Sequence, residues 1–452
     1  MHNLAPLEPG TRALVLGLGR TGLSSARYLD RKGLEVRVAD TRDAPPGLAA
    51  LREQVPGADI HTGVFESKLL DGVAQVVISP GLSLREPVAT EALSRGLPVV
   101  GDIELFARDA QAPVAAITGT NGKSTVTALL AEIANAAHCP AIAGGNLGEP
   151  ALDLLEQPVP RLYVLELSSF QLETTHSLET ATATVLNVTP DHMDRYGSVA
   201  EYAAAKARIF DGCAVAVINA DDRLVRGMPR AGQRVISFSL VDAGADYTLV
   251  NVLEPTLCCR GEALLPVSAM RLQGTHNVAN ALAALAMCEA LGLPRGPVLE
   301  ALAAFGGLAH RTQWVADVNG VRYVNDSKGT NVGATLAAVS GLAGPLVMIA
   351  GGDGKGQDFG PLRDAFSGKV RHVVLIGRDA GALANALDGV CSTEIAGDMR
   401  AAVLATRAAA REGDTVLLSP ACASFDWYES YEQRGDDFRR EAAILIAKRE
   451  RV

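Results

Sequence analysis

The chain has 452 residues, enough for about three domains, and its 20% charged and 48% hydrophobic residues exclude a disordered or fibrous protein. The formal net charge is −10, from 41 Lys and Arg against 51 Asp and Glu. This balance argues against a nucleic-acid partner, because nucleic-acid binders usually carry a basic excess. The 45 Gly exceed the usual share of roughly 7% and predict many tight turns or phosphate-binding loops.

Seven Cys are scattered without a CxxC pair, which is typical of free thiols in a reducing compartment. The first residues show no basic segment followed by an apolar one, so a secretory signal is not predicted. No apolar run reaches the roughly 18 residues of a membrane span. The longest run, 279–293, contains Asn280 and Glu289 and predicts a buried helix. We therefore expect a cytoplasmic protein that does not enter a membrane.

Short β-rich runs alternate with Ala- and Leu-rich helical stretches, a pattern typical of parallel sheets covered by helices. A first series of strands is predicted at 13–17, 35–40, 75–79 and 97–100. A second series follows at 113–117, 162–166, 183–188, 214–219 and 234–239. Helices are then predicted at 276–291 and 297–305.

The character of the sequence changes near Gly306 and Gly307. Segment 313–325 alternates apolar residues around an Asn-Gly pair, which predicts a hairpin, and strands resume at 346–350, 372–376 and 415–418. We therefore predict an α/β protein with domains at 1–102, 103–307 and 308–452. The first and third are expected to be Rossmann-like, and the central one to be a parallel sheet of the P-loop ATPase type.

The segment 17–22 (GLGRTG) follows the first predicted strand and begins a helix, so it matches the GxGxxG fingerprint. Asp40 ends the next strand, where a ribose-binding carboxylate is expected. The glycines let the backbone approach a pyrophosphate, and the helix N-terminus attracts its charge. Three interpretations stay open at this point: a dinucleotide cofactor, another nucleotide diphosphate, or a tight turn without a ligand.

The segment 119–125 (GTNGKST) lies between a predicted strand and a helical stretch, the order of a phosphate-binding loop. Its glycines expose backbone N–H groups to phosphate, Lys123 can reach the β and γ phosphates, and Ser124 or Thr125 can hold Mg²⁺. Ile117 stands where the strict pattern has Gly, so this is a variant P-loop. A Gly-rich turn that carries a lysine by chance is the alternative, which the strand–loop–helix order disfavours.

Polar residues at the ends of two further strands supply candidate metal ligands. Glu166 ends the strand 162–166 and can bind Mg²⁺ directly or through water. His192 lies in the polar segment 187–196 and is a metal ligand, a substrate contact or simply a solvated side chain. Asp191 and Asp194 beside it are either further acids of the site or helix caps.

Seven segments together resemble the Mur ligase family, the ATP-dependent amide-forming enzymes of peptidoglycan precursor synthesis. They occur in order as GTNGKST (119–125), LELSSFQLE (165–173), NVTPDHMDRY (187–196), HNVANALAA (276–284), HR (310–311), NDSKGTN (325–331) and GGDGKG (351–356). The segments 165–173 and 419–438 resemble the branch that adds D-glutamate. The Asp-Asn-Pro-Arg segment of the diaminopimelate- or lysine-adding branch is absent, and Asn121 stands where the alanine-adding branch carries His.

The resemblance implies a reaction and one role for each domain. ATP would phosphorylate the carboxylate of UDP-N-acetylmuramoyl-L-alanine, and the amine of D-glutamate would attack the acyl phosphate. The first domain would bind UDP, the second ATP with Mg²⁺ and the third the amino acid, in a monomer. Two alternatives are a folylpolyglutamate synthase, which should lack the first glycine motif, and a P-loop nucleotide switch, which needs no third domain.

The resemblance also implies which residues form the nucleotide sites, and some residues have two roles. Lys123, His192, Lys206 and Lys328 would be catalytic. ATP would contact Gly119, Thr120, Asn121, Gly122, Lys123, Ser124, Thr125, Asn280, Arg311 and Asp326. The UDP substrate would contact Gly19, Thr21, Asp40, Thr41, Arg42, Asn146 and His192.

The same resemblance implies the metal and amino-acid sites. Mg²⁺ would be held by Ser124, Glu166, His192 and an N-carboxylated Lys206, although composition alone makes Lys206 an ordinary lysine on a helix surface. D-Glutamate would contact Thr330, Lys355, Ser424 and Tyr431, beside Lys328. Phe425 and Tyr431 depart from the Leu and Phe of close relatives, which leaves an apolar surface but alters the details of these contacts.

Overall fold

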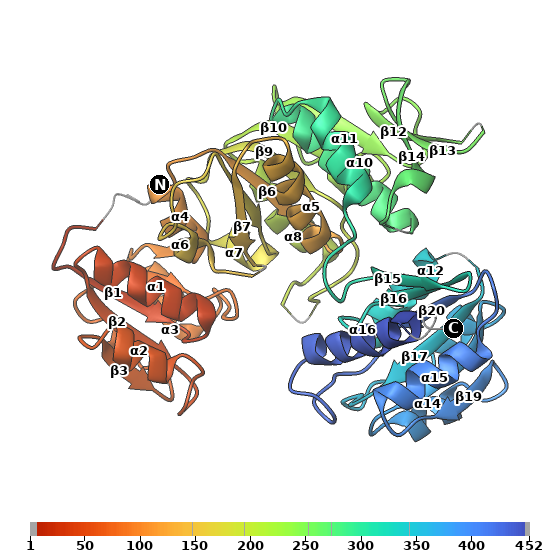
Figure 1. Ribbon diagram of the computed structural model, residues 1–452. Coiled ribbons are helices and arrows are strands. Elements are labelled where there is room, and N and C mark those ends of the chain that lie inside the picture. The colour runs from red at the N-terminus through yellow and green to blue at the C-terminus, as the bar shows by residue number, and fades with distance from the viewer. Residues whose placement is uncertain are drawn as a thin grey trace. The chain divides into compact units, whose positions relative to one another are not determined.

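The computed structural model describes residues 7–447 except for positions 147, 194, 252, 273 and 343. The chain divides into two compact units, one formed by 1–265 with 279–301 and the other by 266–278 with 302–452. The first unit contains two sheets and the second contains one (Figure 1). Each unit is described by itself below.

The first sheet has five strands in the order β3-β2-β1-β4-β5, and every pair is parallel. Its strands are β1 (Arg12–Leu16), β2 (Glu35–Asp40), β3 (Asp59–Thr62), β4 (Val73–Ile78) and β5 (Val99–Val100). The connecting helices are α1 (Arg20–Arg31), α2 (Leu48–Gln54), η1 (Ser67–Leu70) and α3 (Pro87–Ser94). The strand order reverses at β1, and ligands bind at such a switch point, beyond the carboxyl ends of the strands.

The second sheet has nine strands in the order β14-β13-β12-β11-β10-β9-β6-β8-β7. These are β6 (Val114–Thr118), β7 (Ala141–Gly145), β8 (Leu162–Glu166), β9 (Thr180–Val185), β10 (Cys213–Asn219), β11 (Arg234–Ser239), β12 (Tyr247–Asn251), β13 (Pro255–Cys259) and β14 (Glu262–Pro266). Pairing is parallel from β7 to β12, and β13 then runs antiparallel to β12.

The helices of this part precede, separate and follow the nine strands. They are α4 (Asp102–Asp109), α5 (Lys123–Ala136), α6 (Ala151–Leu154), α7 (Ser169–Glu173), α8 (Val199–Ala207), η2 (Arg208–Phe210), α9 (Arg223–Arg226), η3 (Val267–Ala269), α10 (Thr275–Ala290) and α11 (Arg295–Ala304). Residues 281–288 of α10 are buried, as the sequence predicts for this apolar run.

The third sheet has six strands in the order β15-β16-β20-β17-β18-β19. They are β15 (Gln313–Val318), β16 (Val321–Asn325), β17 (Leu346–Gly351), β18 (Val370–Ile376), β19 (Ser392–Ile395) and β20 (Thr415–Leu418). The first two form the predicted antiparallel hairpin, and the other pairs are parallel. Its helices are α12 (Val332–Gly341), α13 (Leu362–Phe366), α14 (Ala380–Ala386), α15 (Met399–Ala409) and α16 (Tyr431–Ala447).

The α/β fold class predicted from the sequence is confirmed by these three sheets and their helices. Strands β3, β7, β12, β13, β14 and β19 were not predicted, and three of them form the antiparallel end of the second sheet. The predicted parallel central sheet thus also has an end at which β13 runs antiparallel to β12. The domain boundaries near 102 and 307 stay predictions.

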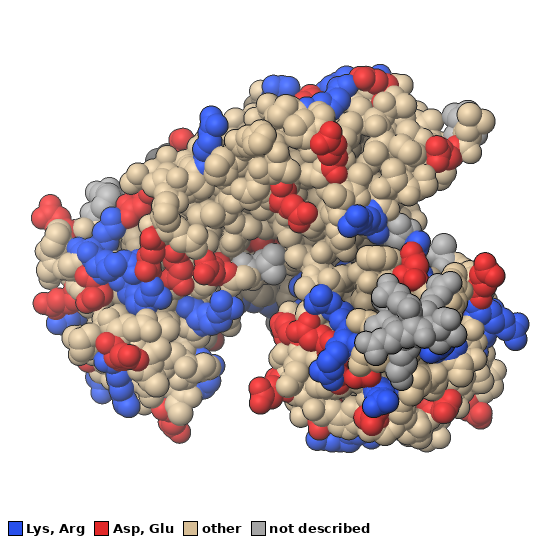
Figure 2. All heavy atoms as spheres, viewed as in Figure 1, with Lys and Arg blue, Asp and Glu red and all other residues tan. Residues whose placement is uncertain are grey.

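The distribution of charge and the character of the helices bear on possible partners. Basic and acidic side chains are interspersed over the face shown in Figure 2. In the part of the chain that the structure describes, no helix has the length and apolar character to cross a bilayer.

Candidate functional site

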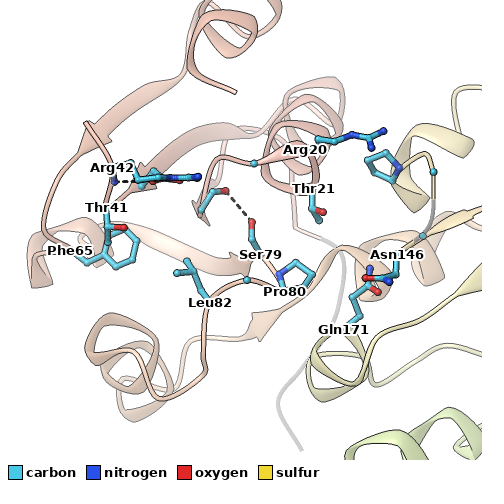
Figure 3. A pocket seen from close by; sticks show the side chains of 17 residues that line it. Arg20, Thr21, Thr41, Arg42, Phe65, Ser79, Pro80, Leu82, Asn146 and Gln171 are labelled. Atoms are coloured by element: carbon cyan, nitrogen blue, oxygen red, sulfur yellow. Dashed lines mark hydrogen bonds and ion pairs between the residues drawn. The ribbon is translucent and has the colours of Figure 1, made fainter. Parts of the chain in front are cut away.

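The first glycine motif forms one wall of a cavity of about 420 Å³, which we call the first cavity (Figure 3). Gly17 has φ +88°, and a Cβ on Gly22 would overlap the carbonyl oxygen of Gly17. The turn therefore requires glycine at both positions, since the left-handed conformation and the close backbone approach both exclude a side chain. Ser79 donates its hydroxyl to the same carbonyl, at 3.0 Å, and ties the end of β4 to the motif.

Six of the seven residues predicted to contact the UDP-linked substrate line the first cavity: Gly19, Thr21, Asp40, Thr41, Arg42 and Asn146. The seventh, His192, is not among its lining residues. Sequence reasoning missed Phe65, Ser79, Pro80 and Gln171, which also line it. Ser79 directly follows β4 at the switch-point edge of the sheet, so the topological rule for ligand sites could have found it.

Both carboxylate oxygens of Asp40 accept hydrogen bonds from neighbouring residues. Its carboxylate accepts hydrogen bonds from the Leu18 N–H at 2.7 Å and from the N–H, Nε and Nη2 of Arg42 at 2.9, 2.8 and 2.7 Å. The hydrogen bonds from the Arg42 side chain lower the pKa of Asp40 to about 2. In this structure Asp40 fixes Arg42 at the cavity wall, and its lone pairs are occupied within the protein.

The second glycine motif forms a closed loop before α5. Gly119 and Gly122 have φ +153° and +85°, and Lys123 donates its ammonium to the carbonyls of Gly119 and Thr120 at 3.0 and 2.9 Å. A Cβ on Gly122 would lie 2.5 Å from Oδ1 of Asn280, so the predicted nucleotide contact Asn280 lies directly against the loop.

The strand end after β9 anchors this loop from its other side. The N–H groups of Thr120 and Asn121 donate to the carbonyl and to the side-chain Oδ1 of Asn187, at 2.9 and 2.8 Å. Ser124 is buried and Thr125 is half-buried in the first turn of α5. The loop geometry thus presents the N-terminus of a 14-residue helix, an arrangement that attracts phosphate.

Glu166 links the phosphate loop to the first cavity. It ends β8, is 2% exposed, and accepts a hydrogen bond at Oε1 from Nδ2 of Asn146 at 2.6 Å. Among the described residues its Oε2 has no hydrogen-bond partner, although it is buried. A buried carboxylate oxygen without a partner is the kind of group that a bound cation satisfies. No set of three His, Cys, Asp or Glu converges as a metal site within the described residues.

Lys206 lies inside the protein, so its interpretation as a surface lysine is wrong. It is 1% exposed on α8, donates to the carbonyl of Gly119 at 2.9 Å, and lies 4.5 Å above the Tyr202 ring. Burial, together with the positive charge of Lys123, lowers the pKa of Lys206 to about 7. A substantial fraction of this side chain is therefore a neutral amine near neutral pH.

His192 lies in an exposed loop with φ +55°. Its Nε2 is 3.6 Å from Oδ2 of Asp191, and its ring meets the Phe170 ring edge-on with 4.9 Å between centroids. Thr120 binds this loop to the phosphate loop by accepting from the Thr189 N–H at 3.0 Å. Asp194 lies outside the described residues.

In the second unit, the predicted nucleotide and amino-acid residues occupy loops at one edge of the third sheet. Asp326 is buried, accepts hydrogen bonds from Thr312 N–H at 3.0 Å and Ser419 Oγ at 2.7 Å, and burial raises its pKa to about 6. The Lys328 ammonium lies 4.2 Å above the Tyr431 ring, and burial together with Arg311 lowers the pKa of Lys328.

The loop that contains Lys355 lies against the loop that contains Ser424. The N–H of Asp353 donates to the carbonyl of Ala423 and the reverse bond forms as well, both at 2.9 Å. Lys355 has φ +52°, and its ammonium lies 5.4 Å from the centroid of the exposed Phe425 ring. Thr330 lies in the loop after Lys328.

Arg434 joins these loops, and sequence reasoning missed it. It is 1% exposed on α16, donates to Oγ and the carbonyl of Ser327 at 3.0 and 2.9 Å, and donates to the carbonyls of Cys422 and Ala423 at 3.1 and 3.3 Å. Burial lowers its pKa to about 10. In the sequence it lies in the charged run RGDDFRR, which resembles a solvated helix face, so no local signal marks it.

Family comparisons cover most of the chain. Residues 11–101 match the Mur ligase MurD-like N-terminal domain, 117–288 the Mur ligase middle domain and 310–422 the Mur ligase glutamate ligase domain. The chain belongs to the Mur ligase family. The resemblance predicted from the sequence is therefore confirmed, and as a Mur ligase the protein is an ATP-dependent ligase.

Curated relatives match this Mur ligase along nearly its full length. The UDP-N-acetylmuramoylalanine–D-glutamate ligase of Nitrosococcus oceani is 52% identical over 98% of this chain and 99% of its own. The protein of the same name from Pseudomonas aeruginosa is 48% identical over 96% of this chain and 98% of its own.

Solved structures of other Mur ligases share the fold. The MurF ligase of Thermotoga maritima in complex with ADP has a TM-score of 0.59 at 15% identity, covering 99% of this chain and 98% of its own. The UDP-N-acetylmuramate-alanine ligase of the same organism has a TM-score of 0.58 at 19% identity, covering 96% of this chain and 99% of its own. At these identities the likeness shows the fold alone.

Proposed function

We propose that this Mur ligase joins D-glutamate to UDP-N-acetylmuramoyl-L-alanine at the expense of ATP, in peptidoglycan precursor synthesis. The observation that carries the proposal is the hydrogen bond between Asn146, which lines the first cavity, and Glu166, which pairs with Ile117 just before the phosphate loop. A substrate whose UDP end occupies the first cavity extends along this contact and brings its carboxylate to the γ-phosphate of ATP. The names of the curated relatives support the same choice of substrates.

The reaction proceeds in two steps. A carboxylate oxygen of UDP-N-acetylmuramoyl-L-alanine attacks the γ-phosphorus of ATP, the bond from this phosphorus to the bridging oxygen breaks, and ADP leaves as the acyl phosphate forms. The D-glutamate nitrogen then attacks the acyl carbon, loses a proton, and the tetrahedral intermediate expels phosphate with the former carboxylate oxygen. Two anions must approach in the first step, so the site needs fixed positive charge and N–H dipoles.

The phosphate loop supplies the first of these groups. Residues 119–125 bind the ATP phosphates through backbone N–H groups at the start of α5, and the Lys123 ammonium moves from its own loop carbonyls to the β and γ phosphates. Asn280 contacts the nucleotide where it lies against Gly122. Arg311 and Asp326 are the nucleotide contacts that we propose for the second unit.

The donor set around Glu166 fits Mg²⁺, because a buried carboxylate oxygen without a partner lies beside the phosphate loop. Ser124, Glu166, His192 and a carboxylated Lys206 would hold the ion. Bound there, Mg²⁺ neutralises charge on the transferring phosphoryl group. The buried Lys206 amine is suited to carboxylation, since its lowered pKa leaves a neutral nitrogen that can add carbon dioxide.

The loops of the second unit bind D-glutamate. Lys328 and Lys355 offer ammonium groups, and Thr330 and Ser424 offer hydroxyl groups, which together match two carboxylates. Tyr431 lies beneath the Lys328 ammonium and limits its positions. The substrates are a nucleotide sugar, a free amino acid and ATP, so we place the reaction in the cytoplasm, in a monomer without a nucleic-acid or membrane partner.

Phosphate release from ATP tests the proposal. Purified protein with UDP-N-acetylmuramoyl-L-alanine and Mg²⁺ should release phosphate only after an amino acid is added, and D-glutamate should exceed L-glutamate, glycine and lysine. A preference for lysine or L-alanine would contradict the assignment within the family. Turnover of a folate with L-glutamate, without any UDP-sugar, would support the folylpolyglutamate synthase alternative.

A further inference from the structure

A second cavity, of about 220 Å³, lies in the first unit at the edge where β1, β2 and β4 begin. The first cavity lies beyond the opposite ends of the same parallel strands, and the two share no lining residue. Side chains from α1, β4 and α4 line the second cavity, together with Leu7, Pro9 and Leu34. Nothing in the proposed ligase reaction uses it.

Two polar side chains of this cavity have unused donors. Gln75 on β4 is 1% exposed and accepts a hydrogen bond at Oε1 from Nη1 of Arg108 at 3.1 Å. This contact fixes the orientation of the amide, because the flipped amide would oppose N–H to N–H. Among the described residues, Nε2 of Gln75 and both Nε and Nη2 of Arg108 are buried without a hydrogen-bond partner.

The two nearby carboxylates hold donors other than those of Gln75. Asp109 lines the cavity, and its Oδ2 receives the Tyr28 hydroxyl at 2.9 Å and the Lys32 ammonium at 2.5 Å. Glu104, 3.6 Å from Nε of Arg108, accepts from Ser177 Oγ at 2.7 Å and from two backbone N–H groups. The buried donors of Gln75 and Arg108 make no hydrogen bond to either carboxylate, so the cavity favours a ligand that accepts hydrogen bonds from them.

The remaining walls are apolar and limit the size of that ligand. Leu29 and Leu105 are buried, and Leu7 and Leu34 line the same space. The volume of about 220 Å³ equals the share of about seven waters in the liquid, at about 30 Å³ each. A short hydrocarbon chain with one acidic group fits this space, whereas a nucleotide does not.

We propose that the second cavity binds a small aliphatic carboxylate. Its two oxygens accept from Nε2 of Gln75 and from the free N–H groups of Arg108, and its hydrocarbon tail contacts the leucine walls. The matching of a planar carboxylate by a guanidinium is favourable in both geometry and charge. The site is separate from the ligase chemistry, so its test does not depend on the proposed function.

The probe is sodium butyrate, titrated into the full-length protein at constant ionic strength and followed by calorimetry and by thermal unfolding. Gln75→Glu is the decisive variant: it replaces the free N–H₂ with a carboxylate that pairs with Arg108 and repels a bound acid. We expect saturable one-to-one binding to the wild type and at least about tenfold weaker binding to Gln75→Glu, as expected for losing a charge-assisted hydrogen bond. Gln54→Glu, on the exposed end of α2, makes the same charge change and should bind as the wild type does.

A second ligand and a second variant distinguish binding of a carboxylate from binding of other molecules. Butyramide should bind at least about tenfold more weakly than butyrate, because a neutral amide offers a single acceptor and no charge. Leu34→Phe keeps both donors but narrows the space, and it should weaken butyrate more than acetate. The proposal is overturned if butyrate shows no saturable binding to the wild type, which would leave water alone on these donors. Equal affinity in Gln75→Glu or equal affinity for butyramide would overturn it as well.

Discussion

The phosphate loop of the first unit and the amino-acid loops of the second unit are built in different ways. The phosphate loop owes its shape to Gly119 and Gly122, both with positive φ, and to backbone contacts with Asn187. The amino-acid loops instead meet around one buried side chain, Arg434, which donates to carbonyls of two of them. A site formed by backbone turns can be recognised from a short stretch of sequence, because its glycines are close together in the chain. A site held together by a side chain from a distant segment cannot be recognised in this way.

The largest effect should follow from removing the cation of the phosphate loop. Lys123→Ala takes away the ammonium that opposes the phosphate charge, and we expect kcat/KM to fall about 10³-fold. Steady-state phosphate release measures it, with circular dichroism to confirm folding. Lys68→Ala, which removes an exposed lysine paired with Glu66, is the matched control and should retain activity. A loss below tenfold in Lys123→Ala would contradict its place at the transferred phosphate.

Lys206→Ala should lower kcat about 10²-fold, because it removes the proposed carbamate next to the loop. Added short-chain carboxylates should restore part of the activity by supplying the missing anionic group. The measurement is phosphate release with increasing formate or acetate at fixed ionic strength. If the folded variant shows no rescue, the carbamate role is wrong and the buried lysine acts only as a hydrogen-bond donor to the carbonyl of Gly119.

Gly122→Ala tests the claim that backbone geometry builds the phosphate loop. The added methyl would lie 2.5 Å from Oδ1 of Asn280, so this side chain must move, and we expect the KM for ATP to rise about tenfold. Gly96→Ala is the control: its φ of +77° carries the same left-handed penalty of roughly 1–2 kcal/mol, but no atom lies within 4 Å of the new Cβ. Equal ATP affinity in the two variants would show that the contact between the added methyl group and Asn280 does not affect ATP binding.

Arg434→Lys tests the other half of the comparison. A lysine keeps the charge but cannot donate to Ser327 and to Cys422 and Ala423 at once, so the amino-acid loops should separate. We expect the KM for D-glutamate to rise about tenfold while the KM for ATP stays within about twofold. Arg439→Lys, on the exposed face of the same helix, should change neither. A parallel rise in both KM values would reveal a general loss of structure instead.

The smallest expected effect is the loss of stability on replacing Asp40. It is an exception to the comparison, because a side-chain contact here stabilises a turn that is formed by glycines. Its pKa of about 2 lies below the ordinary value of 3.8, so its contribution to stability is present above pH 4 and is lost as the pH falls toward 2. The contribution is at most about 2 kcal/mol, since the Arg42 partner is half exposed. Urea unfolding of the wild type and Asp40→Asn should show a difference at pH 5 that falls to about a third at pH 2.5, because the carboxylate of the folded protein is still partly ionised there. A difference independent of pH would contradict it.

The sequence predicted the parts of the fold that local patterns determine. The predicted strands 162–166 and 415–418 coincide with β8 and β20, because each is a buried apolar run. The predicted strand 234–239 coincides with β11, in which buried and more exposed residues are mixed. The missed strand β13 begins with Pro255 and has only three buried apolar residues, and the missed strand β19 is exposed at every residue. An edge strand such as β19 forms because a neighbouring strand offers hydrogen-bonding groups, which a single segment does not reveal.

The candidate sites also differ in how far they could be predicted from the sequence. The two glycine motifs could be read from the chain because their turns need glycine at fixed positions. The burial of Lys206 could not, because its helix sequence EYAAAKARIF has no feature that distinguishes a buried lysine from an exposed one. Only the packing of α8 against the phosphate loop places its ammonium on the Gly119 carbonyl.

The central claim is that one site activates a carboxylate by phosphorylation and then forms an amide. Oxygen transfer tests it most directly: UDP-N-acetylmuramoyl-L-alanine labelled with ¹⁸O in its carboxylate is turned over with ATP and D-glutamate, and the released phosphate is analysed by mass spectrometry. The account predicts one labelled oxygen in each phosphate, because the attacking carboxylate oxygen leaves with phosphorus. Phosphate without the label, at full amide formation, would contradict it.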